Sequence, residues 1–401
     1  MNSIVKKIAF VSKRDLVWAA GLFLIFAAYY SFILINRIPT DLQPHAKMAY
    51  SFSQGEVKLL PNFLYFFLLS LFTGFSTQYS LYYFPTVILI SLAITAKFFI
   101  TKFYAAKFCS ICNQNKVYAY LIATVMLFVF ALPGLNYFTS HQFYMGQLVP
   151  NVWHSSTTIF LMPFAEVLFF ESYILLFLEE KKIKRKIFQI VLLIILNALI
   201  KPSFLFTLLP TVALFFFIQY FFFKREKGYW VKPLPYIIGF VFIVIEYYFI
   251  YKLNYSGVSY SDKTNSGIDF EPFAIWLSYS PDLIVAFITS CFFPLVYIIF
   301  SKGLVLKNKL VQFSLSNYLI GLSLWILLAE QGFRRSDGNF IWQMVVTSYL
   351  LFFTLLMNFF NEAKLGTLTK MQQWIIGGSF FLHFAWGVYY WLKIIIFSNY
   401  A

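Results

Sequence analysis

Long runs of apolar residues, separated by short polar stretches, recur along the whole chain. Three examples are LVWAAGLFLIFAAYYSFILI near the N-terminus, FPTVILISLAITAKFFI after residue 83 and PYIIGFVFIVIEYYFI after residue 234. Each is close to the length that crosses a bilayer as an α-helix, about 20 residues. The pattern predicts an all-α polytopic transmembrane helical bundle, forming one domain over residues 1–401 without a separate soluble domain.

We expect about eleven spans. They are placed near residues 16–36, 81–101, 117–133, 157–178, 187–200, 203–222, 235–252, 281–300, 311–329, 341–360 and 372–395. The run at 187–200 is short for a span and stops at Lys201 and Pro202, because proline cannot continue the helix. The apolar run at 61–75 is not counted, because counting it would invert the charge pattern of every later loop. It is expected to form a juxtamembrane helix on the outer surface, within an outer loop at 37–80.

Basic residues concentrate in alternate loops. The segments 1–15, 102–116, 179–186, 223–234, 301–310 and 361–371 hold 21 Lys and Arg, and the segments on the opposite side hold 7. The positive-inside rule therefore places the N-terminus in the cytoplasm and the C-terminus outside. The net charge of +15 is then explained by orientation and by contact with membrane lipids, and a nucleic-acid partner is not expected. The Lys-, Phe- and Ile-rich composition suggests an AT-rich bacterial genome, hence an integral protein of a bacterial plasma membrane.

The three cysteines predict neither a disulfide framework nor a metal site. Cys109 and Cys112 form a CxxC, but no second pair and no nearby histidine completes a zinc site, and Cys291 lies far along the chain. No metal ligands are predicted. The sequence leaves the cofactor open, with a divalent cation as one alternative. The first apolar run lacks a small-residue cleavage site, so it is expected to be a retained helix.

Polar side chains of many kinds collect in the segments predicted to lie outside. The stretch GQLVPNVWHSSTTIFLMP, which begins at Gly146, is the densest of them. The candidate catalytic residue is Asp41, in the first outer loop. The candidate substrate-binding residues are His45, Gln147, Asn151, His154, Lys201, Glu330, Arg334, Asp337 and Asn339. We expect Asp41, Asn151, His154, Lys201 and Arg334 to meet in one outer cleft.

Each candidate has a structural alternative. Asp41 can cap the helix that follows it, and residues 151–156 can cap the helix that starts near Thr157. His45 can be an ordinary surface histidine. The loop that holds Arg334 and Arg335 can be a local set of ion pairs, although an arginine can also bind phosphate oxygens through bidentate hydrogen bonds.

Other ionisable residues fall inside or beside predicted spans. Glu166, Glu171 and Glu246 are expected to face the bundle interior, because a charge at that depth is costly when it faces lipid. Asp282 is expected to cap a helix, where a negative charge also suits the helix dipole. His383 is expected to be a packed histidine.

The layout resembles the GT-C-fold membrane glycosyltransferases. An Asp in the first outer loop, a P-x-x-L-Y helix from Pro61 to Tyr65, about eleven spans and an outer polar cleft carry this resemblance. The patterns GQ…PNVWH…T…P, KPSF and E-x-G-x-R-x-x-D-G-N-F-x-W, the last from Glu330 to Trp342, are similar to uncharacterised bacterial membrane proteins associated with surface polysaccharides. In many GT-C enzymes an acidic pair stands in the first loop, whereas here Asp41 is followed by Leu42.

The resemblance implies an extracytoplasmic transfer of a sugar from a polyprenyl-phosphate-linked donor to a cell-surface glycan or lipid acceptor. Asp41 would then be the general base, and the cations would stabilise the departing phosphate. A polysaccharide polymerase or ligase acting on lipid-linked glycans shares this physics. A transporter or flippase is the alternative of another class, and it predicts polar groups spread through the depth of the membrane together with an internal repeat.

Overall fold

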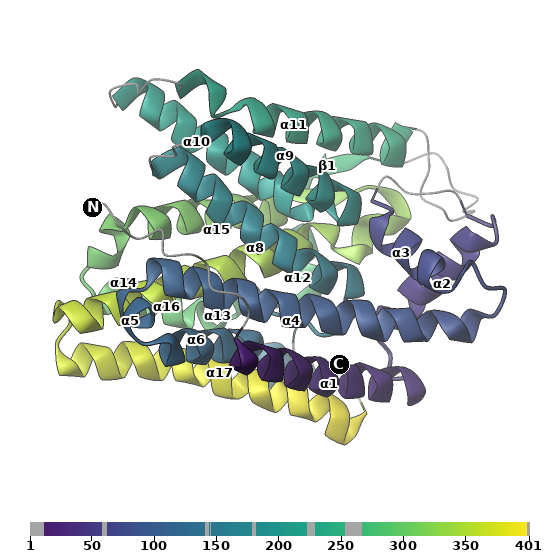
Figure 1. The fold of residues 1–401 in the computed structure, drawn as a ribbon, viewed down its shortest axis with the longest axis horizontal. Helices are drawn as coiled ribbons and strands as arrows, with labels where there is room; N and C mark the ends of the chain where they lie inside the picture. Colours follow the sequence, from purple (N-terminus) through teal and green to yellow (C-terminus); the bar gives the residue numbers. More distant parts are fainter. Residues whose placement is uncertain are drawn as a thin grey trace.

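The fold is almost entirely helical (Figure 1). It is given by a computed structural model, which describes residues 12–57, 62–140, 144, 146–178, 182–222, 229–252 and 267–398. The long helices run roughly side by side. This arrangement is the one expected when every backbone polar group has to be satisfied within its own helix in lipid.

Within these ranges, eight helical segments are long and apolar enough to cross a membrane. They are Lys13–Ile35, Tyr79–Phe108, Ser156–Phe177, Pro202–Phe222, Tyr229–Lys252, Lys309–Leu327, Arg334–Leu365 and Lys370–Phe397. A further pair, Leu283–Ser290 and Phe292–Phe300, passes the same criteria together but is bent by 69° at Cys291. The structure is thus that of an all-α bundle of membrane-length helices, as the sequence predicts.

The helix bounds follow the chain in a regular order. The α-helices of ten residues or more are α1 (Lys13–Ile35), α2 (Leu42–Ser53), α4 (Tyr83–Phe108), α6 (Lys116–Phe128), α8 (Ser156–Phe177), α9 (Ile183–Ile200), α10 (Leu205–Phe222), α11 (Leu234–Tyr247), α15 (Lys309–Leu327), α16 (Trp342–Leu365) and α17 (Lys370–Phe397). The shorter α-helices are α3 (Leu64–Phe72), α5 (Ser110–Gln114), α7 (Leu135–Ser140), α12 (Ala274–Tyr279), α13 (Leu283–Ser290) and α14 (Phe292–Phe300).

Short helical turns and one small sheet complete the described fold. The 3-10 turns are η1 (Tyr79–Tyr82), η2 (Pro202–Phe204), η3 (Tyr229–Val231), η5 (Leu304–Lys307), η6 (Gly332–Asp337) and η7 (Asn339–Ile341), and η4 (Tyr248–Lys252) is a π-helical turn that extends α11. The strands β1 (Ile268–Phe270) and β2 (Leu328–Glu330) pair antiparallel, with Ile268 opposite Glu330.

Two predicted spans are not among the membrane-length helices. The segment predicted at 117–133 contains α6, which has 13 residues and ends at Phe128. The segment predicted at 187–200 lies in α9, whose first turns carry Lys184, Arg185 and Lys186. The run at 61–75 contains only the nine-residue α3, which is too short to cross a bilayer. Pro61, the first residue of the P-x-x-L-Y motif, lies outside the described residues.

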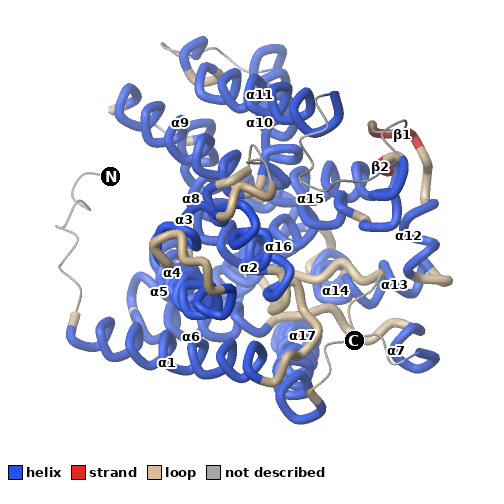
Figure 2. The backbone as a smooth tube through the Cα atoms, turned by 90° about the vertical axis from the view of Figure 1, so that its right-hand side faces the viewer, coloured by secondary structure: helices blue, strands red, loops and turns tan. Residues whose placement is uncertain are grey.

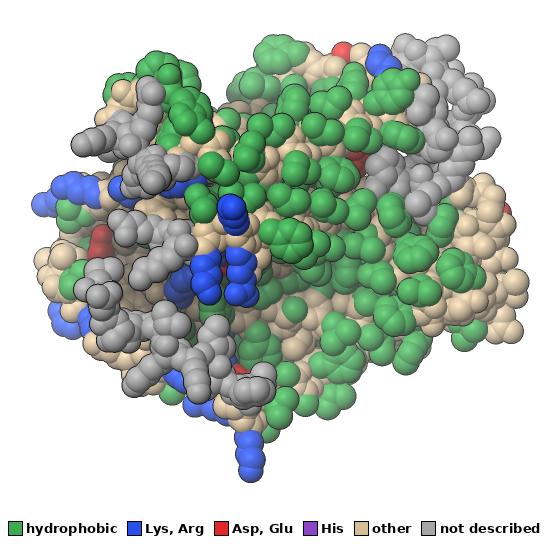
Figure 3. Space-filling view, turned by 45° about the horizontal axis from the view of Figure 1, so that its top comes forward, with side chains coloured by type: hydrophobic (Ala, Val, Ile, Leu, Met, Phe, Trp, Pro, Cys, Tyr) green, Lys and Arg blue, Asp and Glu red, His purple; other side chains and the backbone are tan. Residues whose placement is uncertain are grey.

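The most buried helices are α8 and α16, and α4 packs against α8, α1 and α6. The helices α1, α11 and α17 expose more of their apolar surface. Figure 3 shows a broad band of hydrophobic side chains, with Lys and Arg side chains gathered at the left end of the molecule. This band agrees with a membrane-embedded surface, and the helices α5 and α14 lie toward the same left end in Figure 1.

The opposite end carries α2 and α3, at the right of Figure 1. The helix α2 contacts α4 and α8, while α3 contacts α9. Figure 2 looks onto this end and places α2 and α3 near the middle of the bundle, in front of the ends of the longer helices. The first predicted outer loop therefore covers the start of α8, where the densest polar stretch of the sequence lies.

Candidate functional site

Asp41 stands at the start of α2, directly before its first residue Leu42. Its side chain makes no capping hydrogen bond with the backbone of α2, so the capping alternative does not account for this carboxylate. Instead, the carboxylate is close to Ser155 and to the charge of Lys201. Burial raises the pKa of the Asp41 carboxyl, while the Lys201 charge and a hydrogen bond from Ser155 act in the opposite direction.

Lys201 is positioned by the end of α9. Its own backbone is extended, as expected for a residue before proline, and its N–H still bonds to the carbonyl of Asn197 at 2.9 Å. The ammonium donates to Oγ1 of Thr158 at 2.9 Å, in the first turn of α8, and lies 4.0 Å from the ring centre of Trp342. Lys201, which lies between α9 and α10, therefore contacts the first turns of both α8 and α16.

Two histidines flank this pair. His45, one turn into α2, contacts Oγ of Ser156 through Nδ1 at 2.7 Å. The ring of His154 lies 4.7 Å from the ring of Tyr144 and 5.8 Å from that of Trp342. Burial, followed by the Lys201 charge, lowers the pKa of His45 to about 3 and that of His154 well below its usual range. Both imidazoles are thus neutral at pH 7, and Lys201 is the nearby cation.

Asp41 and Lys201 are close enough for each charge to affect the other, yet within the described residues they form no direct ion pair. Burial lowers the pKa of Lys201 to about 7, and the Asp41 carboxylate acts against this shift. Lys201 lies outside the membrane-length segments, one residue before Pro202. An acid and a cation therefore share one site without forming an ion pair. We call Asp41, His45, His154 and Lys201, with the start of α8, the Asp41–Lys201 site.

A surface hollow of about 710 Å³ adjoins the segment before α2. Thr40 and Gln43, which flank Asp41 in sequence, line it together with Arg37, Tyr79 and Tyr83. Hydrogen bonds among these residues hold the wall of the hollow. The side-chain oxygen of Gln43 accepts from Thr40 at 2.8 Å, and the backbone carbonyl of Gln43 accepts from Tyr79 at 3.1 Å. Aromatic rings beside hydroxyl and amide groups are the side chains that suit a sugar.

Two other predicted residues have their side chains occupied by the fold. The amide nitrogen of Asn151 donates to the carbonyls of Met126 and Val129, at 3.0 and 2.7 Å, and its oxygen accepts from Lys97 at 2.6 Å. Both donor hydrogens are therefore used by the end of α6. The Gln147 oxygen accepts from Thr289 and Ser290 of α13, at 3.1 and 2.9 Å. These contacts shape the loop that leads to His154.

Replacing Asn151 by Ala should destabilise the protein. The change would leave two buried carbonyls at the end of α6 and the buried Lys97 ammonium without their partner, and each unsatisfied buried group costs about 1–3 kcal/mol. A lower melting temperature of the purified protein is expected. The matched control is Asn113→Ala, an exposed residue of the short α5, which should melt like the wild type. Equal melting of Asn151→Ala and Asn113→Ala would contradict a structural role for the Asn151 amide.

The later predicted residues form a second polar cluster. Arg334 pairs with the buried Glu330 at 3.1 Å, while the Glu330 carboxylate also accepts from Tyr251 at 2.5 Å and from Asn339. Asp337 is exposed but close to the charge of Arg334. Arg335 pairs with Glu271 and is half exposed. This Glu330–Arg334 cluster contains ion pairs, as the structural alternative expects, and its partly exposed Arg334 still faces solvent.

The predicted residues thus fall into separate groups. Asp41, His45, His154 and Lys201 lie together, while Glu330, Arg334, Asp337 and Asn339 form the second cluster. The two groups are linked through the chain, because Trp342, whose ring touches Lys201, follows Asn339 by three residues. Asn151 and Gln147 contact the scaffold.

The sequence did not single out three further residues. Lys97 lies in the middle of α4, inside an apolar run of the sequence. Gln343, next to Trp342, is fully buried, and neither atom of its amide is bonded to a described residue. Trp342 ends the motif that starts at Glu330, and its ring contacts both Lys201 and His154. A polar residue inside an apolar run is the signal that could have found Lys97 and Gln343.

Several other predictions have structural outcomes. Asp282 caps α13, since its carboxylate accepts from the N–H of Val285 at 3.0 Å. His383 is packed as expected, bridging the carbonyl of Phe130 and the N–H of Phe293. Glu166 and Glu246 are buried. Among the described residues, no group of three His, Cys, Asp or Glu side chains could hold a metal ion.

Comparison with known protein families, curated proteins and solved structures found no match to this chain.

Proposed function

We propose that this protein transfers a sugar from a polyprenyl-phosphate-linked donor to a cell-surface glycan or lipid acceptor, on the extracytoplasmic side of a bacterial plasma membrane. The observation that carries the proposal is the Asp41–Lys201 site, where a carboxylate with a raised pKa and a cation share a half-buried position without pairing directly. A base beside a cation is the pair of groups that this transfer needs.

Asp41 is the general base. Its carboxylate takes the proton from the acceptor hydroxyl as that oxygen attacks the anomeric carbon of the donor sugar. The bond between the anomeric carbon and the phosphate oxygen breaks, and its electron pair leaves with the polyprenyl phosphate. A raised pKa makes the carboxylate a stronger base than an exposed aspartate, while the charge of Lys201 keeps part of it ionised.

Lys201 stabilises the negative charge that grows on the departing phosphate. Its ammonium is held by Thr158 and by the Trp342 ring, so it is oriented before the substrate arrives. The first turn of α8 adds backbone N–H groups and the positive end of a helix dipole, both favourable for an anion. The hollow beside Thr40 and Tyr79 is a suitable place for the acceptor sugar.

A polymerase or ligase that moves a lipid-linked oligosaccharide would use the same groups. The size of the unit transferred separates the two activities, and the products of one assay distinguish them.

One observation favours the transport alternative. Polar side chains follow one another along α4. Lys97 lies over the Tyr349 ring of α16. Further along α4, Thr101 donates to Glu166 of α8 at 2.9 Å, and Tyr104 donates to Glu171 of α8 at 2.8 Å. The Glu171 carboxylate also pairs with Lys186. Aromatic packing accompanies these groups, since Phe170 stacks on Tyr104 at 4.1 Å.

The test is a transfer assay with purified protein in lipid nanodiscs. A panel of polyprenyl-phosphate sugars is supplied with cell-surface glycan from a strain that lacks the gene, and mass spectrometry follows the release of polyprenyl phosphate and the mass gained by the acceptor. We expect a gain of one sugar. A gain of a whole repeat unit would identify a polymerase or ligase. Movement of lipid-linked sugar across proteoliposomes without any transfer would contradict the proposal.

A second experiment tests the orientation of the protein. Labelling of a cysteine at position 183 by an impermeant reagent in intact cells would also contradict the proposal, since this would put the site on the cytoplasmic side.

A further inference from the structure

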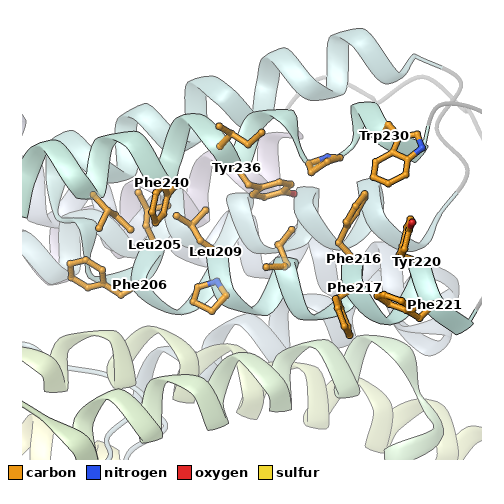
Figure 4. Close-up of a pocket in the computed structure, with 16 residues that line it drawn as sticks. Leu205, Phe206, Leu209, Phe216, Phe217, Tyr220, Phe221, Trp230, Tyr236 and Phe240 are labelled. Atoms are coloured by element: carbon orange, nitrogen blue, oxygen red, sulfur yellow. The ribbon is translucent and has the colours of Figure 1, made fainter. Parts of the chain in front are cut away.

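A long apolar groove runs between α10 and α11 along the side of the bundle (Figure 4). Its volume is about 840 Å³, and its walls are apolar and aromatic side chains, among them Phe206, Phe216, Trp230 and Phe240. Gly239 of α11 allows α10 to pack closely, because a Cβ atom at this position would lie 3.1 Å from the Leu209 side chain. The groove is open on the side where Ala213, Phe217 and Ile237 are exposed, which is the face expected to meet lipid.

The groove begins next to the polar groups described above. Leu205, at one end, lies four residues after Lys201, about one helical turn. On the other wall, Ile243 lies three residues before the buried Glu246, which is within reach of the Arg334 charge. The end of the groove at Leu205 and Ile243 is therefore the end that is near Lys201 along one chain segment and near Glu246 along the other.

The length of the groove indicates the kind of chain that would fill it. From Leu205 to Phe221 the groove follows α10 for 16 residue steps, or about 24 Å at 1.5 Å per residue. The hydrocarbon core of a bilayer is about 30 Å thick, so one leaflet offers only about 15 Å. An acyl chain that stays within one leaflet would follow about 15 Å of this groove, or nearly two thirds of it, whereas a polyisoprenoid chain is long enough to follow all of it.

We propose that the α10–α11 groove binds the isoprenoid chain of a polyprenyl-phosphate lipid and places the phosphate of that lipid beside Lys201. The inference rests on the proposed function for the choice of lipid, and it adds the binding site, the direction of the chain and the residues that hold it. The apolar walls bury the chain, and the groove opens to the membrane, so the lipid enters sideways from the bilayer with its phosphate at the outer surface.

The experiment uses photolabelling of the full-length protein in nanodiscs. The probe is a polyprenyl monophosphate with a diazirine in its last isoprene unit, and labelled peptides are mapped by mass spectrometry. We expect label in α10 and α11 near Phe221 and Trp230, at the end away from Lys201. Unlabelled polyprenyl phosphate should compete, and phosphatidylglycerol should not.

Matched variants test the groove itself. Ala213→Trp should fill it and remove the label, while Leu214→Trp, the next residue on the same exposed surface but outside the groove, should keep it. Ile237→Trp and Ile238→Trp are the equivalent pair on α11, used if a variant of α10 does not fold. Label that survives both groove-filling variants, or that phosphatidylglycerol competes away equally, would overturn the proposal.

The labelling result is independent of transfer. Specific label in the groove without any sugar transfer would overturn the proposed function and leave the lipid site standing. Sugar transfer with label outside α10 and α11 would do the reverse.

Discussion

Replacing Asp41 by Asn is expected to lower the rate of sugar transfer by about 100-fold to 10,000-fold, the usual contribution of a general base. Asparagine keeps the shape of the side chain but cannot accept the proton of the acceptor hydroxyl. Donor binding should stay near that of the wild type, because Lys201 and the start of α8 are unchanged. The measurement is kcat and KM for the donor in nanodiscs, with the loss expected in kcat.

The matched control is Glu56→Gln, an exposed carboxylate of the same outer loop, which should transfer at the wild-type rate. Because burial raises the pKa of Asp41, activity of the wild type should fall on the acid side of neutrality at a higher pH than an exposed aspartate would give. The Asp41→Asn variant should lack this acid limb. Full activity of Asp41→Asn would remove Asp41 from the mechanism.

The membrane-length helices were predictable because each is encoded locally. A run of about twenty apolar residues has few alternatives to a spanning helix, and loop charges add a consistent pattern. The two predicted spans that are not membrane-length helices are those where local signals conflict. The helix α9 combines an apolar run with three basic residues at its start, and α6 stops at Phe128 although the apolar run continues.

The site was less predictable because it depends on contacts between segments far apart in sequence. Asn151 and His154 are three residues apart, yet the Asn151 amide bonds to α6 while the His154 ring faces Trp342. Nothing in the local pattern separates these two outcomes. In the same way, the partners of the Lys97 ammonium inside the bundle come from distant segments, because Asn151 reaches it from the loop before α8 and the Tyr349 ring from α16.

Replacing Lys201 by Met should lower kcat/KM for transfer by about 100-fold to 1,000-fold, the range found when one group that stabilises a transition-state charge is removed. Methionine preserves much of the apolar stem that packs near Trp342 but removes the cation. Lys47→Met, an exposed change in α2, is the control and should leave transfer unchanged. Wild-type activity of Lys201→Met would show that the phosphate is neutralised elsewhere, with Arg334 as the nearest candidate from the second cluster.

The pH profile separates a direct role of Lys201 from a structural one. Because burial lowers the pKa of Lys201 to about 7, the free enzyme loses this charge as the pH rises through that value, and kcat/KM should fall there. Lys201→Arg stays charged across this range, so its activity, although reduced by the different geometry, should show no such fall.

In Lys201→Met the pKa of Asp41 should rise further, because the cation that favours the carboxylate is gone. The acid limb should therefore move to higher pH, and an acid limb that does not move would contradict a shared site for Asp41 and Lys201.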